Sequence, residues 1–154
     1  MQPIRRILFP TDFSEHADSA WLYALQFAQQ FGADVHLLHV VSPPPHMGEA
    51  YLGNFDSRKY VQALTSAAND SMDRQIEAAK DRALIFRREA RVGVAFREII
   101  EYAAKHDIDL IVMGTHGHTG LAHVVLGSVA EKVVRTAPCP VLTVRCPAMQ
   151  GGPT

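Results

Sequence analysis

The sequence predicts an α/β fold: one domain built on a Rossmann-like, doubly wound, five-stranded parallel sheet of order 3-2-1-4-5, with helices on both faces. Three observations predict it. Short apolar runs alternate with segments whose apolar residues recur at helical spacing. The run over 35–41 is apolar apart from two histidines, as expected of a strand covered on both faces. A chain of 154 residues, 47% hydrophobic and 20% charged, fits one domain with a sizeable core.

The first part of the chain is expected to form a strand, a helix and a second strand. The apolar run over 7–9 predicts the first strand. Asp12 and Ser14 are both good helix N-caps, and Gly32 stands where a helix commonly ends. A helix is therefore predicted from these caps to Gly32. The second strand covers 35–41 and ends before a run of three prolines.

Two further features of this part bear on function. We expect His36 and His39 to lie on one face of the second strand, as satisfied core residues or as part of a dimer surface. The loop over 42–56 is long enough to be a functional flap or a partner surface.

The second part of the chain continues the alternation. A helix is predicted from 58 to about 82, and we favour a third strand that ends at Val92. Ser128 and Glu131 have the S-x-x-E spacing of a capping box, which predicts Ser128 as the N-cap of the last helix. The remaining predicted elements are a helix over about 96–106, a strand over 108–113, the helix from Ser128 to about 135, and a strand over 141–144.

Composition narrows the possible functions. A formal net charge of −1 argues against a nucleic-acid binder. No apolar run approaches the roughly 18 residues of a membrane helix, and no signal peptide is evident, so a cytoplasmic location away from membranes is expected. Cys139 and Cys146 flank the last strand, too far apart to form a disulfide. We expect the domain to cover 1–146 and the tail 147–154 to be disordered.

The loop after the fourth strand carries glycines at 114, 117, 120 and 127. It lies between a buried strand and a helix, so bare backbone N–H groups meet the positive end of a helix dipole, where phosphate binds. The spacing is not the G-x-G-x-x-G of dinucleotide sites, and the lysine of a P-loop is missing. The alternative is a purely structural role, in which these glycines only form turns.

These residues resemble a known family. The pattern Gly114-x2-Gly117-x9-Gly127-Ser128 matches the ATP-binding signature of the universal stress protein family. The similarity extends from Ile4 to Val144, and its clearest further parts are 9–14 (FPTDFS), 37–41 (LLHVV), 127–131 (GSVAE) and 138–144.

The resemblance implies a site for ATP, with Mg²⁺ as a possible companion. The backbone of Val40 would meet the adenine edge, and His118 stands where the family often has arginine or lysine. Because neutral imidazole is a weaker phosphate partner, affinity is expected to depend on pH. From the adenosine side to the phosphates, the expected cofactor-binding residues are Pro10, Thr11, Asp12, Val40, Met113, Gly114, Thr115, His116, Gly117, His118, Gly127, Ser128 and Val129.

The resemblance therefore implies an ATP-binding, stress-response regulatory protein that forms a homodimer through 141–144. Two alternatives remain open: a slow ATPase or nucleotide hydrolase, and a dimeric scaffold with a vestigial nucleotide site. No catalytic residue is assigned, because no carboxylate near the loop is placed to activate water. No metal site is assigned to His116, His118 and His123, because nothing supplies a fourth ligand.

Overall fold

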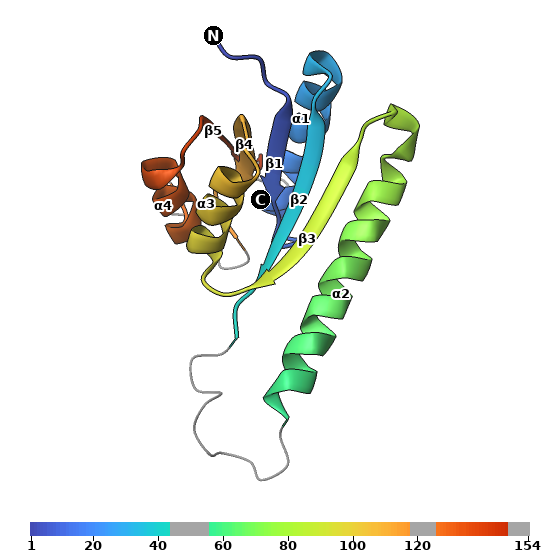
Figure 1. Ribbon diagram of the computed structural model, residues 1–154, viewed down its shortest axis with the longest axis vertical. Coiled ribbons are helices and arrows are strands. Elements are labelled where there is room, and N and C mark those ends of the chain that lie inside the picture. Colours follow the sequence, from blue (N-terminus) through green and yellow to red (C-terminus); the bar gives the residue numbers. More distant parts are fainter. Residues whose placement is uncertain (44–55, 118–125, 148–154) are drawn as a thin grey trace, which may run out of the picture.

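The computed structural model describes residues 1–43, 56–117 and 126–147 (Figure 1). Its sheet has the order β3-β2-β1-β4-β5 with every neighbouring pair parallel, which confirms the predicted fold class. In chain order, the elements are β1 (Arg6–Pro10), α1 (Glu15–Phe31), β2 (Asp34–Val41), α2 (Ser57–Ala78), the short 3₁₀ helix η1 (Lys80–Arg82), β3 (Phe86–Val92), α3 (Ala95–Lys105), β4 (Leu110–Gly114), α4 (Ser128–Thr136) and β5 (Val141–Val144).

The core has two layers, one on each face of the sheet. Ile7 and Phe9 of β1 pack toward α1 and α2, where the ring of Trp21 lies 5.0 Å from that of Phe9. Leu8, between them, packs toward α3 and α4 on the other face. This alternation along one strand is what covers the parallel sheet on both sides and makes β1 fully buried from Ile7 to Phe9.

Most predicted element boundaries are confirmed. Ser14 is the N-cap of α1, and its hydroxyl accepts a 3.2 Å hydrogen bond from the N–H of Ala17. Gly32 ends α1 in the left-handed conformation, with φ of 66°, which glycine adopts without a steric cost. The third strand ends at Val92, as predicted.

The predicted N-cap of α4 is wrong by one residue. Gly127 is the N-cap, in extended conformation, and its carbonyl accepts the 2.9 Å bond from the N–H of Glu131. Ser128 is therefore the first helical residue, and no side chain caps this helix. The S-x-x-E spacing does not register the contacts of Gly127: its N–H bonds to the carbonyl oxygen of Thr115 at 2.6 Å, and a Cβ at this position would stand 3.0 Å from the same oxygen.

The prediction that His36 and His39 share a face is also wrong. They are three residues apart on β2, and side chains separated by an odd number point to opposite faces of a strand. The Nδ1 of His36 lies 2.8 Å from the hydroxyl of Tyr102 on α3. The Nδ1 of His39 instead lies 2.8 Å from the carbonyl oxygen of Thr11.

The remaining sequence predictions have mixed outcomes. Cys139 and Cys146 are free thiols, and burial raises the pKa of Cys139 to about 11. Among the described strands, β5 pairs with β4 alone and forms one edge of the sheet, and a homodimer through this edge stays a prediction. Within the described residues, none of the helices has the length and apolar character needed to cross a membrane. The loop over 44–55 and the tail from 148 lie outside the described residues.

Candidate functional site

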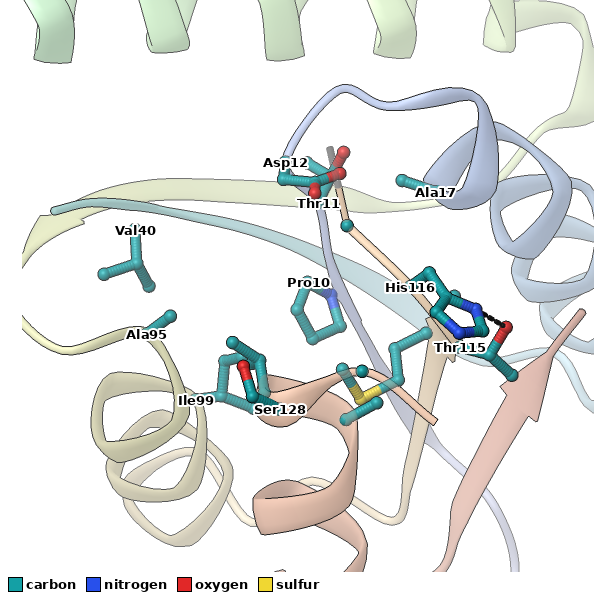
Figure 2. Close-up of a pocket in the computed structure, with 16 residues that line it drawn as sticks. Pro10, Thr11, Asp12, Ala17, Val40, Ala95, Ile99, Thr115, His116 and Ser128 are labelled. Carbon is teal, nitrogen blue, oxygen red and sulfur yellow. Dashed lines mark hydrogen bonds between the residues drawn. The ribbon is translucent and has the colours of Figure 1, made fainter. Parts of the chain in front are cut away.

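A cavity of about 490 Å³ opens at the carboxyl ends of β1 and β4 (Figure 2). These two strands are neighbours, and the chain order of the sheet reverses between them, which is where ligands bind in doubly wound folds. The residues that line the cavity are Pro10, Thr11, Asp12, Ala17, Val40, Ala95, Ile99, Met113, Gly114, Thr115, His116, Gly117, Gly127, Ser128, Val129 and Ala130.

The structure brings together every predicted site residue that it describes. His118 is the exception, and it lies outside the described residues together with His123. Four lining residues were not predicted: Ala17, Ala95, Ile99 and Ala130. They are small or apolar and come from helices, so the sequence carried no chemical signal that distinguished them from core residues.

The turn between β1 and α1 forms one wall of the cavity. Thr11 is buried, and its hydroxyl oxygen accepts a 3.0 Å bond from the N–H of Phe13. One carboxylate oxygen of Asp12 accepts a 3.0 Å bond from the N–H of Ser14. The turn is thus held by its own side chains, which fixes where the Asp12 carboxylate stands.

At three glycines of the loop an added Cβ would stand unusually close to a neighbouring atom. A Cβ on Gly114 would stand 2.8 Å from the backbone oxygen of His16, so β4 can approach α1 only without a side chain here. A Cβ on Gly117 would stand 2.6 Å from Oδ2 of Asp12, and one on Gly127 would stand 3.0 Å from the Thr115 carbonyl oxygen. The glycines therefore have a packing role beyond forming turns, and all three line the cavity.

The cavity has an apolar side and a polar side. Val40 and Ala95 lie together on one side, and Thr115 and His116 lie across from them (Figure 2). The Thr115 hydroxyl and Nδ1 of His116 are 2.9 Å apart. An aromatic base fits the first side, and a hydrogen-bonding group fits the second.

The N-terminus of α4 also faces the cavity. Ser128 and Val129, its first two residues, line it, and the first N–H groups of a helix have no partners within that helix. Together with the helix dipole they favour an anion. Among the described lining residues there is no lysine or arginine, and Asp12 is the one carboxylate.

A Ser128→Ala substitution is expected to change the free energy of unfolding by less than about 0.5 kcal/mol, because the hydroxyl does not cap α4. An N-cap serine would cost about 1 kcal/mol when replaced by alanine. Urea denaturation of the wild type and the variant at pH 7 gives the loss in free energy of unfolding and so distinguishes the two cases. A loss of 1 kcal/mol or more would restore Ser128 as the cap.

The described residues hold no group of three or more histidine, cysteine, aspartate or glutamate side chains that could bind a metal ion on their own. His16 and His116 do approach each other, with ring centroids 5.6 Å apart, but they are only a pair. A metal ion in this cavity would therefore need further oxygen ligands from a bound molecule or from water.

Comparison with known proteins agrees with this architecture. The model of the universal stress protein family matches residues 3–145. The chain belongs to this family. Its β1–α1 turn, its β2 and its glycine loop, which carried the resemblance in the sequence, all lie within the matched range.

Individual members of the family match over almost the whole chain. Universal stress protein MJ0531 of Methanocaldococcus jannaschii is 36% identical over 143 residues, covering 93% of this chain and 83% of the relative. The solved structure of protein MJ0577 is 31% identical with a TM-score of 0.83, covering 94% of this chain and 98% of that one. A universal stress protein solved in complex with cAMP has the same fold, at 24% identity, 94% and 98% coverage and a TM-score of 0.64.

Proposed function

We propose that the protein is an ATP-binding regulatory protein of the stress response, and that it holds the nucleotide in the cavity between the ends of β1 and β4. The observation that carries the proposal is the convergence of three separate segments. The turn after β1, the end of β2 and the loop before α4 together line one cavity, with an apolar side and a helix N-terminus. The family member solved with cAMP adds support for an adenine nucleotide.

In this proposal the base lies against the apolar side, near Val40. The phosphates lie at the first turn of α4, against the backbone N–H groups of Ser128 and Val129. Because the described lining has no lysine or arginine, Mg²⁺ is included to neutralise phosphate charge, with Asp12 as the one nearby carboxylate. The proposal does not include hydrolysis, because with Asp12 assigned to Mg²⁺ the described lining holds no second carboxylate to activate water.

The test is direct detection of the ligand. The protein is purified without added nucleotide and denatured, and the released small molecules are identified by mass spectrometry. The emptied protein is then titrated calorimetrically with ATP, in Mg²⁺ and in EDTA. We expect an adenine nucleotide in the first experiment, and saturation at one ATP per chain with tighter binding in Mg²⁺ in the second.

Two results would overturn the proposal. One is the absence of a co-purified nucleotide together with no heat of binding at millimolar ATP. The other is saturable ATP binding that the Gly127→Val variant discussed below leaves unchanged, since the ligand would then bind elsewhere. GTP is the matched control ligand, because it carries the same triphosphate and tests whether the base is recognised.

A further inference from the structure

His39 lies behind the wall of the cavity and does not line it. Its neighbour on β2, Val40, points into the cavity, so the imidazole of His39 points to the opposite face of the sheet. There its Nδ1 lies 2.8 Å from the carbonyl oxygen of Thr11, in the turn that forms one wall. A carbonyl can only accept a hydrogen bond, so Nδ1 carries a proton and donates it, whether the ring is neutral or charged.

The same imidazole also holds the next part of the turn. The ring of Phe13 is stacked on that of His39, with centroids 4.7 Å apart and planes at 28°. Phe13 has φ of 62°, the left-handed conformation, which costs a residue with a Cβ about 1–2 kcal/mol. Backbone held in such a conformation persists only where its surroundings restrain it, and such positions concentrate at binding sites.

The position of this turn decides the shape of the cavity. Two hydrogen bonds to β2 hold the backbone of Thr11: its N–H donates to the carbonyl of Leu38 at 2.9 Å, and its carbonyl accepts from Nδ1 of His39. Asp12 follows directly, and its Oδ2 stands so near Gly117 that a Cβ there would approach it to 2.6 Å. Because Thr11, Asp12 and Gly117 all line the cavity, a rotation of the turn changes the space left for a ligand.

We propose that His39 is a positioning residue of the nucleotide site: the hydrogen bond from its Nδ1 to Thr11 holds the Thr11–Phe13 turn in the strained conformation that the ligand requires. The inference rests on the function proposed above. It adds a residue that lies outside the cavity and touches no ligand.

A matched pair of substitutions tests it. In His39→Asn the amide nitrogen takes approximately the place of Nδ1 and can donate to Thr11, whereas in His39→Gln the amide nitrogen takes approximately the place of Nε2 and cannot. Neither side chain titrates, and both lose the ring. Calorimetric titration with ATP and Mg²⁺ is expected to give a dissociation constant within about threefold of wild type for His39→Asn, and about tenfold weaker for His39→Gln.

The outcomes separate the two proposals. If the wild type binds no ATP, the proposed function fails and the role of His39 fails with it. If the wild type binds ATP and His39→Gln binds it as tightly as His39→Asn does, only the role of His39 is overturned. Urea denaturation of both variants is the control: if the bond from Nδ1 serves stability alone, the two variants differ in their free energy of unfolding but bind ATP equally well. Should His39→Gln not fold, His39→Leu, which also lacks a donor, replaces it.

Discussion

A chain that carries Gly127→Val is expected to bind ATP at least about a hundredfold more weakly than the wild type and to keep its fold. A Cβ at this position would stand 3.0 Å from the carbonyl oxygen of Thr115 and 3.4 Å from the Cα of His116. Both contacts are with backbone, which cannot move aside as the end of a side chain can. The methyl groups of valine would therefore displace the glycine loop at the proposed phosphate end of the cavity.

The fold is expected to survive because the backbone conformation suits valine. Gly127 has φ of −65° and ψ of 159°, which is extended and open to any residue except for its contacts. The free energy of unfolding should therefore fall by no more than about 1–3 kcal/mol, as for other overpacked sites. Far-UV circular dichroism and urea denaturation check the fold, and calorimetry with ATP and Mg²⁺ checks binding.

Thr136→Val is the matched control for this substitution. Thr136 is exposed, lies at the opposite end of the same helix and is outside the cavity, so valine there should leave ATP affinity unchanged. Equal affinity in the Gly127→Val chain and the wild type would contradict the placement of the ligand at the N-terminus of α4. Equal loss in both variants would show that valine in this helix acts through stability alone.

The strands, the helices and their order could be predicted from the sequence because they follow local rules. Continuous apolar runs and helical periodicity identify buried parallel strands and their covering helices. The carboxyl ends of adjacent parallel strands then bring the turn after β1 and the loop after β4 to one place. The family resemblance implied one site for Thr11 and Gly114, and the structure places both in the lining of one cavity although they are far apart in the chain.

The parts that were missed depend on contacts across the fold. Ser128 has the right neighbour for a capping box, but the close approach of Gly127 to Thr115 makes the glycine the N-cap, and no local pattern contains that contact. Ala95 and Ile99 line the cavity only because the start of α3 lies beside the end of β2. The role inferred for His39 likewise requires its distance to Thr11.

Acid is expected to destabilise the protein through His36, a buried histidine on the face of the sheet covered by α3. Only 2% of its surface is exposed, and burial, the nearby His106 and Arg87 lower its pKa from 6.5 to about 4, against a smaller opposing effect of Asp34. His36 therefore binds a proton below about pH 6.5 in the unfolded chain but only below about pH 4 in the folded chain. Because the unfolded state binds more protons in that interval, stability falls as the pH falls through it.

The shift corresponds to about 3 kcal/mol lost between pH 7 and pH 4, at about 1.4 kcal/mol per pH unit. Tyr102, which bonds to Nδ1 of His36 at 2.8 Å, does not titrate in this interval, since burial raises its pKa to about 12. Asp73 adds an acid-dependent loss of its own, because its hydrogen bond with Arg88 lowers its pKa. The His36 contribution must therefore be measured as a difference between two chains.

His36→Asn provides that second chain, because its amide can replace the Nδ1 bond to Tyr102 and does not titrate. It should be less stable than the wild type at pH 7, because the smaller side chain loses the buried contacts of the imidazole ring. Urea denaturation of both chains at pH 7, 6, 5 and 4 should show this gap narrowing by about 3 kcal/mol toward pH 4. A difference in stability that stays constant would mean that His36 has the same pKa in the folded and the unfolded chain, and that the space around it admits water.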